Sequence, residues 1–555
     1  MPTIVLNKAD LMDQAVVSIP IEKLTDILSN IKCELENQTD EEITIEVNSD
    51  RPDLFSSEGI TRALRSYLNG SGPYSVKRYE GPPLKLQVDP STAGVRPLIM
   101  CAAIRGISLT SEATKQFMQL QEKLHNTYAS NRRKASIGVY DLDKVVPGFL
   151  YTALPADKIS FIPLDCDKEM TGSQILETTS KGKDYAGILA GKERYPVLMD
   201  CRGNVLSMPP IINSEQTRVT EHSKNLFIDV TGLEEKAINT CLNIMATSVL
   251  ERGGSLQQVQ ISYPAKTITT PSMDRRLQRL SNTTVDSVSG LNLSNDETMK
   301  LLNRMGFQST LAAQGTLEVE IPPFRVDILH EVDLVEDVII AYGLNRMIPE
   351  VPKVMTMGRL LPGSRLRLRV RDLMVGSCFQ EIASYVLSNR EVMEDRPLLP
   401  KRQLVEIIKP ISSEYTVLRD SILPKILQFL GCNTHIAYPQ RLFEYGEVVG
   451  QVQGRAPNST HLSAAMSDYK ISFEEMQAVA VALFKNLSKD VAFEPHSEPT
   501  FIEGRTAKMV IDGREIGTIG EVNPQVLVNF GINCPTAAME CDMSRFAALE
   551  SLFRS

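Results

Sequence analysis

Two neighbouring stretches of the chain place polar side chains among prolines and apolar residues, as a small reaction pocket would require. In residues 204–215, two prolines remove backbone donors and stiffen the chain between Ser207 and Asn213. Further along, Asp229 and Thr231 alternate on a predicted strand and therefore share one face. These side chains could bind a polar group or order a water molecule. A buried β-core with satisfied polar groups would show the same pattern.

A second group of candidate residues is acidic, and its spacing follows a helix. Asp333, Glu336 and Asp337 fall at positions i, i+3 and i+4, and Asp327 lies at the end of a predicted strand before them. Like charges at this spacing repel one another unless a cation or another partner offsets them. An oxygen-only set suits Mg²⁺ with several retained waters. The alternative is a set of solvated acids favoured by the dipole of the helix N-terminus.

Standard active-site motifs are absent from the sequence. His330-Glu331 begins an HExxH pattern, but position 334 is leucine. Gly182-Lys183 lacks both the upstream glycine and the following Ser/Thr of a P-loop, and no GxGxxG or GxSxG occurs. The nine cysteines contain no CxxC pair, so a zinc ribbon is not expected. Any active site must be built without these motifs.

The composition is that of an ordinary globular chain with several domains. The 555 residues exceed the size, roughly 250–300 residues, at which single cores stop growing. A net charge of −9 weakens a nucleic-acid-binding interpretation, which would rest on local basic patches at 132–134 and 365–371. No leader pattern or long apolar run is present, and the scattered cysteines suit a reducing compartment. We therefore expect a cytoplasmic protein without membrane contact.

Changes in pattern divide the chain into four predicted domains of an α+β multidomain protein. A mixed α/β segment, 1–82, ends in a linker rich in glycine and proline. An α+β domain at 83–265 and a compact unit at 266–348 follow, and alternating strands and helices fill 349–555 after a linker at 352–362. Helices are predicted at 21–33, 110–126, 235–252, 294–305, 333–342 and 364–375, with another starting near Ser56 as N-cap.

The order of motifs resembles that of the β chain of phenylalanyl-tRNA synthetase in its archaeal/eukaryotic form. The resemblance runs from end to end. It is carried by residues 50–54 (DRPDL), 119–123 (QLQEK), 135–141 (ASIGVYD), 204–215, 333–337 (DLVED), 341–343 (AYG), 371–376 (RDLMVG) and 410–419. It implies an α2β2 heterotetramer in which the α subunit binds ATP and phenylalanine and the complex charges tRNA(Phe).

For residues 83–265 the resemblance implies an editing domain that hydrolyses tyrosine wrongly attached to tRNA(Phe). A pocket built for phenylalanine only weakly rejects an added hydroxyl, by roughly 10²-fold, so a second site is needed. The pocket residues implied by the family motif are Leu198, Ser207, Asn213, Arg218, Asp229 and Thr231. Arg218 follows Thr217 without a glycine that relatives carry there. A purely structural and tRNA-binding subunit with an inactive pocket is the alternative.

The resemblance also assigns expectations to the last two domains. The acids Asp327, Asp333, Glu336 and Asp337 match a magnesium site shared with the α subunit, on a winged-helix-like domain at 266–348, and Asp337 replaces the more usual glutamate. Residues 349–555 resemble an antiparallel-sheet class II synthetase module that has lost its catalytic groups. Leu442 stands where a phosphate-binding arginine would precede Glu444, and 537–543 lacks the glycines and the arginine of a working site. We therefore expect a non-catalytic module.

Overall fold

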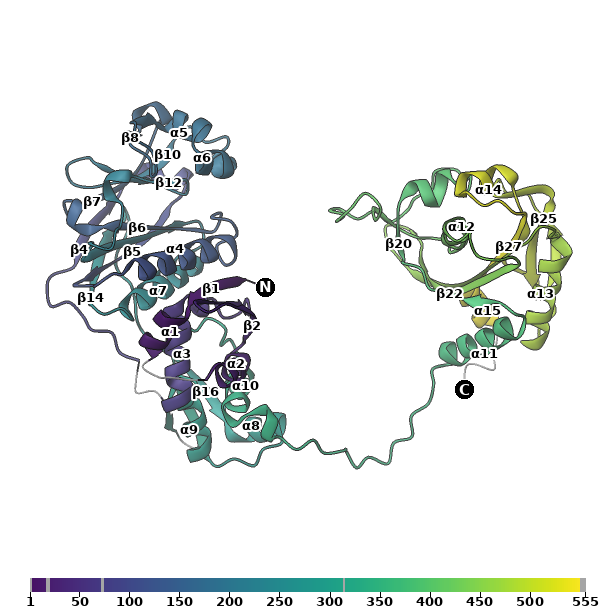
Figure 1. Ribbon diagram of the computed structural model, residues 1–555, viewed down its shortest axis with the longest axis horizontal. Coiled ribbons are helices and arrows are strands. Elements are labelled where there is room, and N and C mark those ends of the chain that lie inside the picture. Colours follow the sequence, from purple (N-terminus) through teal and green to yellow (C-terminus); the bar gives the residue numbers. More distant parts are fainter. Residues whose placement is uncertain (1, 16–19, 71–73, 313–314, 550–555) are drawn as a thin grey trace. The chain divides into compact units, whose positions relative to one another are not determined.

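The computed structural model describes residues 2–15, 20–70, 74–312 and 315–549. Within these ranges helices and strands are mixed throughout, as expected for the mixed α/β multidomain class. The chain forms two compact units, Met1–Glu350 and Val351–Ser555 (Figure 1). In the described part of the chain, no helix has both the length and the apolar character needed to cross a membrane.

The first unit begins with a small antiparallel sheet in the order β1-β3-β2, accompanied by three helices. Its elements are β1 (Thr3–Asn7), α1 (Lys8–Ala15), α2 (Ile21–Asn30), β2 (Cys33–Gln38), β3 (Glu42–Val47) and α3 (Ser57–Asn69). The hydroxyl of Ser56 accepts a hydrogen bond from the backbone of Gly59 at 3.2 Å, which confirms the predicted N-cap of α3. The predicted helix 21–33 was too long. It ends at Asn30 because Lys32 adopts a left-handed φ of 67° and Cys33 already pairs with β3.

A ten-stranded sheet forms the centre of the first unit. Its order is β12 (Ile212–Asn213), β11 (Val205–Met208), β10 (Tyr195–Met199), β7 (Phe149–Leu154), β4 (Leu84–Val88), β14 (Ser255–Ser262), β5 (Leu98–Arg105), β13 (Asn225–Gly232) and β6 (Ala135–Asp141), with β15 (Thr267–Thr270) beside β14. Helices α4 (Ser111–Asn126) and α7 (Glu235–Leu250) lie between this sheet and the N-terminal elements (Figure 1). Their apolar residues join both layers in one core. The short elements β8 (Ser160–Phe161), β9 (Met170–Thr171), α5 (Gly172–Thr178) and α6 (Ser180–Tyr185) lie between β7 and β10 in sequence.

The two ends of the ten-stranded sheet meet. Asn213 on β12 donates from Nδ2 to the carbonyl oxygen of Val139 on β6, at 3.4 Å. Tyr140 on β6 lies 2.7 Å from the hydroxyl of Ser207 on β11. Since β12 and β6 are the first and last strands of the sheet order, these contacts show that the sheet curls until its ends touch. We call this line of contact the seam.

A three-stranded sheet with three helices completes the first unit. Its elements are β16 (Arg276–Ser281), α8 (Asn282–Ser289), α9 (Asn295–Arg304), β17 (Gln308–Leu311), β18 (Thr316–Ile321) and α10 (Glu331–Tyr342). The strands pair antiparallel in the order β16-β18-β17, and β17 and β18 pair with each other on either side of residues 313–314. Leucine, valine, isoleucine and phenylalanine side chains from the sheet and all three helices form a separate core.

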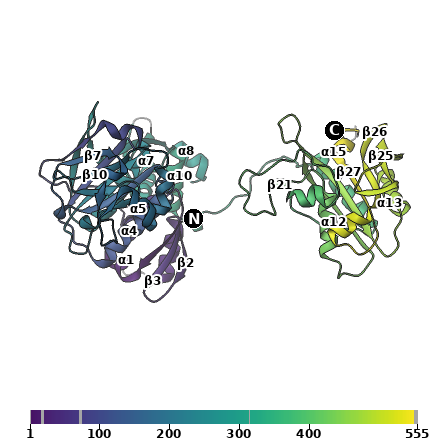
Figure 2. The same cartoon turned by 90° about the horizontal axis from the view of Figure 1, so that it is seen from above.

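The second unit contains a seven-stranded sheet with helices on both faces. The order is β19 (Gln380–Glu381), β22 (Gln440–Val449), β23 (Asn458–Ser467), β27 (Thr536–Asp542), β26 (Arg514–Val522), β25 (Phe501–Ile511) and β24 (Ala492–Pro495), antiparallel except between β19 and β22. One core contains α11 (Pro362–Gly376), α13 (Phe473–Asn486) and α15 (Met543–Leu549), and the other contains α12 (Leu423–Cys432) and α14 (Pro524–Phe530). Figure 1 labels α11 and α14, and Figure 2 labels α12, α13 and α15. Strands β20 (Leu387–Ser388) and β21 (Val417–Leu418) form a separate pair.

Candidate functional site

A cavity of about 200 Å³ opens at the seam of the ten-stranded sheet. Three of the predicted pocket residues line it: Ser207, Asn213 and Asp229. Ser207 on β11 stands opposite Asn213 on β12 and opposite Leu198 on β10, so these three form one row across three strands. Asp229 comes from β13, at the other end of the sheet order. The curl of the sheet therefore brings together residues that the sequence separates.

Tyr140 connects the two sides of the seam. Its hydroxyl lies 2.7 Å from Oγ of Ser207 and also forms a short hydrogen bond with the carboxylate of Asp229. A phenol has one proton, so when Asp229 is ionised the tyrosine donates to the carboxylate and accepts from the serine. All three side chains are buried. The result is a fixed chain of hydroxyl, phenol and carboxylate in the cavity wall.

Burial controls the charge of Asp229. Its carboxyl group has almost no solvent exposure, and desolvation raises its pKa to about 7, against the hydrogen bond from Tyr140 and the charge of Arg96. The phenol of Tyr140 is likewise buried, and its pKa lies well above the ordinary value because of burial and the adjacent carboxylate. Asp229 therefore changes its charge near neutral pH.

Gly138 leaves room for this network. It lies opposite Asp229 in the pairing of β6 with β13. A Cβ at this position would come within 2.1 Å of the Tyr140 hydroxyl and 2.3 Å of Asp229 Oδ1, so no larger residue fits without moving them.

The other three predicted pocket residues lie outside the cavity lining. Leu198, beside Ser207 on the neighbouring strand, is fully buried in the core. Thr231 accepts a hydrogen bond at its hydroxyl from Arg96 Nε, at 2.9 Å, and its carbonyl accepts another from Arg96 Nη2, at 2.8 Å. It thus fixes the buried guanidinium whose charge opposes the burial-driven rise in the pKa of Asp229. Arg218 is partly exposed and pairs with Glu215 and Asp165. The functional roles predicted for these three residues stay predictions.

Charged groups surround the mouth of the cavity. Arg132 donates from Nη1 to the carbonyl oxygens of Pro210 and Ile211, at 3.2 and 3.0 Å, and from Nη2 to Glu122 at 2.7 Å. Burial alone would raise the pKa of Glu122, but neighbouring cations and hydrogen bonds hold it at about 2. Arg132 is buried, so the basic patch expected at 132–134 is wrong for this residue. It fixes the proline-containing wall instead.

The four predicted magnesium ligands have other partners. Arg325 pairs with Asp327 at 2.8 Å and with Asp337 at 2.6 Å. Asp333 accepts hydrogen bonds from two backbone amides before α10, at 2.7 Å each, and Glu336 pairs with Lys32 at 2.8 Å.

Charge compensation at these acids therefore comes from the protein. Burial would raise the pKa of Asp327, but the charge of Arg325 holds it below its ordinary value, whereas burial prevails at Asp337 and raises its pKa. Among the described residues no three metal-binding side chains converge, although Asp337 Oδ1 is buried there without a hydrogen-bond partner. In this arrangement the four acids do not fit one magnesium ion, because a guanidinium lies where a cation between Asp327 and Asp337 would bind.

In the second unit, the two positions compared above with a working synthetase site, Leu442 and Glu444, are both buried in the sheet. Leu442 is buried in the core that contains α12. Glu444 is also buried, and its carboxylate pairs with Arg419 at 2.7 Å and accepts a hydrogen bond from Ser384 at 2.6 Å. The acid and the arginine neutralise each other, so neither presents a free charge to a ligand.

Sequence reasoning missed Tyr140, Gly138 and Arg132 as parts of the site. The stretch 135–141 carried a signal, since it contributed to the family resemblance. Its contact with Ser207 depends on the curl of the sheet, which spacing along the chain does not reveal.

Comparisons with known proteins agree with this architecture. Residues 348–543 match the model of the phenylalanyl tRNA synthetase beta chain CLM domain, residues 278–344 the tRNA synthetase B5 domain, and residues 125–263 the B3/4 domain. The chain is 39% identical over 525 residues to a phenylalanine–tRNA ligase beta subunit of Archaeoglobus fulgidus, with 94% of each chain covered. It is 38% identical over 553 residues to that of Pyrococcus furiosus, covering 97% of this chain and 99% of the relative.

A solved structure resembles the first part of the chain. It is the crystal structure of an N-terminal fragment of the phenylalanyl-tRNA synthetase beta-subunit from Pyrococcus horikoshii. The TM-score is 0.59 at 36% sequence identity, and the alignment covers 62% of this chain and all of that fragment.

Proposed function

This chain belongs to the family of phenylalanine–tRNA ligase beta subunits, and we propose that its seam cavity is the editing site of the assembled enzyme. The observation that carries the proposal is the buried chain of Ser207, Tyr140 and Asp229 in the wall of a 200 Å³ cavity. Internal hydrogen bonds satisfy this network, but burial of the Asp229 carboxyl group in an apolar wall still raises its pKa to about 7, as is common at functional sites.

The network distinguishes tyrosine from phenylalanine by its hydrogen bonds. A tyrosyl group brings a phenol that can exchange hydrogen bonds with Asp229 and Ser207. A phenylalanyl group would cover the same polar atoms without pairing with them, which costs binding energy. The site thus accepts the mischarged product and spares the correct one. Gly138 lets Tyr140 and Asp229 keep the positions from which they would meet the substrate phenol.

Hydrolysis at this site proceeds by water rather than through a covalent enzyme intermediate. The hydroxyl of Ser207 is engaged with Tyr140, and the described lining of the cavity contains no histidine. The buried His125 cannot act as a base toward Ser207, because its Nε2 accepts a hydrogen bond from the amide of Ile137, at 2.8 Å. Burial lowers the pKa of His125 to about 4, so it is neutral at physiological pH. The protein's contribution is to hold the ester and a water molecule in place, with help from the terminal hydroxyls of the tRNA.

We further propose that the chain acts within an α2β2 heterotetramer. In this proposal the α subunit binds ATP and phenylalanine, tRNA(Phe) contacts both subunits, and the whole acts in the cytoplasm. Residues 349–555 serve as a non-catalytic class II-like module, for which the buried Leu442 and the neutralised Glu444 give support. The division into domains 1–82, 83–265, 266–348 and 349–555 is part of the same proposal. Magnesium binding stays a prediction, and no step depends on it.

The test is the hydrolysis of tyrosyl-tRNA(Phe) by this chain co-expressed with its α partner. The wild-type complex should deacylate tyrosyl-tRNA and spare phenylalanyl-tRNA, and Asp229→Ala should lose most of this activity. Asp157→Ala removes an exposed carboxylate of the same domain and serves as the matched control. If the complex charges tRNA normally but the wild type hydrolyses no tyrosyl-tRNA above the uncatalysed rate, the chain is a structural and tRNA-binding subunit with an inactive pocket.

A further inference from the structure

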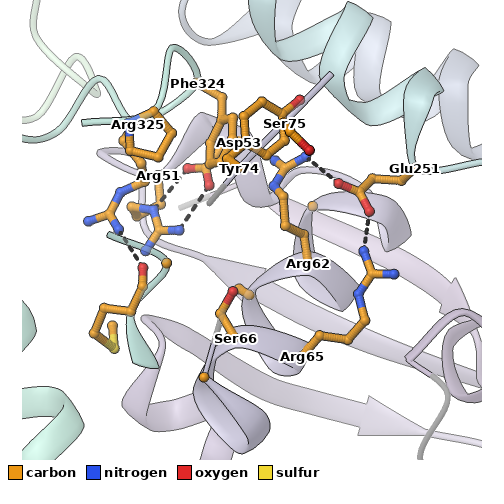
Figure 3. A pocket seen from close by; sticks show the side chains of 16 residues that line it. Arg51, Asp53, Arg62, Arg65, Ser66, Tyr74, Ser75, Glu251, Phe324 and Arg325 are labelled. Atoms are coloured by element: carbon orange, nitrogen blue, oxygen red, sulfur yellow. Dashed lines mark hydrogen bonds and ion pairs between the residues drawn. The ribbon is translucent and has the colours of Figure 1, made fainter. Parts of the chain in front are cut away.

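We propose that a second cavity in the first unit binds a phosphoryl oxyanion. The cavity has a volume of about 340 Å³, within the roughly 300–1,000 Å³ typical of ligand pockets. It lies where α3, the end of α7 and the segment after β18 meet, and Figure 3 shows the side chains that line it. Its lining does not overlap that of the seam cavity. Its charged lining consists of Arg51, Arg62, Arg65, Arg325, Asp53 and Glu251.

The local fold fixes these arginines around the cavity. Arg62 and Arg65 are one turn apart on α3, and both point toward Glu251 (Figure 3). The turn that carries Arg51 and Asp53 packs directly on the start of α3. Gly59 permits this approach, because a Cβ there would lie 1.8 Å from the carbonyl oxygen of Asp53.

The lining carries more positive than negative charge. Arg51 is held by Asp53 through two hydrogen bonds, at 2.8 and 2.9 Å. Arg62 and Arg65 share the single carboxylate of Glu251, and the Arg62 contact is long, at 3.4 Å. The charge of Arg325 is neutralised by ion pairs with acids that do not line the cavity. Arg62 and Arg65 carry two positive charges, and Glu251 offsets one of them. One uncompensated positive charge therefore faces the cavity.

Arg62 is the group that points to a ligand. It is 8% exposed, and its guanidinium lies 3.8 Å above the ring of Phe324, which Tyr74 contacts edge-on at 5.0 Å. Its Nη2 is buried and has no hydrogen-bond partner among the residues that the structure describes. A charged donor buried in this way is costly unless an acceptor completes it. An anion in the cavity would supply that acceptor.

The arrangement favours a phosphoryl group over a carboxylate. Guanidinium groups donate in a planar fork that matches the oxygens of phosphate, and several of them face one cavity here. A phosphoryl group offers more acceptor oxygens and more charge than a carboxylate, so it can use both Arg62 and Arg65. The source is either a small phosphate compound or a phosphate of bound RNA, and the chemistry is the same.

Titration of the co-expressed α–β complex with inorganic phosphate, followed by ³¹P NMR at constant ionic strength, tests the site. We expect saturable binding that Arg62→Gln weakens at least tenfold and Arg65→Gln weakens less, because Arg65 is more exposed. Glu251→Gln should strengthen binding, because it removes the carboxylate that competes with the anion. Arg202→Gln, at an exposed position of the same unit, is the matched control and should leave the affinity unchanged.

Misfolding would weaken phosphate binding in both variants. The expected result, weaker binding for Arg62→Gln and stronger binding for Glu251→Gln, therefore cannot come from misfolding. The proposal is overturned if phosphate shows no saturable binding, if Arg62→Gln has no effect, or if Arg62→Gln and Glu251→Gln weaken binding alike. The salt dependence of tRNA(Phe) binding then identifies the source. If the ligand is an RNA phosphate, Arg62→Gln weakens tRNA binding and reduces the salt slope by about one. If tRNA binding is unchanged while phosphate binding falls, the ligand is a small phosphate compound.

Discussion

Replacing Asp229 by asparagine should change the pH dependence of stability around the seam. Burial raises the pKa of Asp229 from 3.8 to about 7, so between these values the folded protein holds a proton that the unfolded chain has released. Stability therefore falls as pH rises through this window, and the loss is complete above pH 7. Of the window between pH 3.8 and about pH 7, about two pH units lie above pH 5. At about 1.4 kcal/mol per unit, the wild type loses about 3 kcal/mol between pH 5 and pH 8.

Asparagine has no such proton, so Asp229→Asn should not show this loss. The substitution also alters the hydrogen bond with Tyr140, but that change is similar at both pH values. Hydrogen exchange of peptides covering β6 and β13, measured by mass spectrometry, reports the local free energy of opening. The protection of the variant relative to the wild type should rise by about 100-fold from pH 5 to pH 8.

The comparison at two pH values removes the effect of pH on intrinsic exchange, because both proteins share it. Asp157→Asn, which changes an exposed carboxylate of the same domain, should show no such rise. A ratio for Asp229→Asn that stays constant between pH 5 and pH 8 would refute the reasoning, since Asp229 would then ionise in the folded protein as it does in the unfolded chain.

Three further substitutions test the packing described above. Gly138→Ala should cost about 1–3 kcal/mol and abolish tyrosyl-tRNA hydrolysis, because its Cβ would displace the Tyr140–Asp229 pair; unchanged hydrolysis would contradict this geometry. Arg325→Met should destabilise the first unit by about 3–5 kcal/mol, because it leaves two buried aspartates without their cation, and denaturant unfolding monitored on α10 by hydrogen exchange should show the loss. Leu442→Arg should restore no adenylate formation and should cost several kcal/mol, about 3–5, by burying an unpaired charge; a variant as stable as the wild type in the same exchange assay would refute the burial of this side chain.

Local signals in the sequence predicted local structure well. The N-cap at Ser56 and the alternation of Asp229 and Thr231 on one strand follow from rules that span a few residues, and both are confirmed. The end of α2 was predicted too late, because lysine seldom adopts the left-handed conformation that Lys32 has here, so its residue type gave no sign of it. At this position the pairing of Cys33 with β3 outweighs the helical pattern.

Contacts between distant segments could not be predicted in the same way. Tyr140 and Ser207 are 67 positions apart, and only the curl of the sheet makes them neighbours. The acidic residues of α10 were visible as a pattern, but their partners were not. Lys32 reaches Glu336 across 304 positions, and Arg325 pairs with Asp337 because the loop before the helix folds back. Spacing on a helix predicts repulsion between acids and leaves open which cation relieves it.

The contacts between the N-terminal elements and residues 276–344 bypass the ten-stranded sheet that lies between them in sequence. Lys32 on one side pairs with Glu336, Arg62 stacks on Phe324, and Arg304 donates to the carbonyl oxygen of Tyr67 at 3.1 Å. Although the three-stranded sheet has a core of its own, we expect these contacts to couple its opening to that of the N-terminal elements, which are distant in the chain. The small N-terminal sheet and the three-stranded sheet should gain or lose exchange protection together. A shortened chain that ends after the large sheet would leave Arg62 without its aromatic partner and Lys32 without one of its acids.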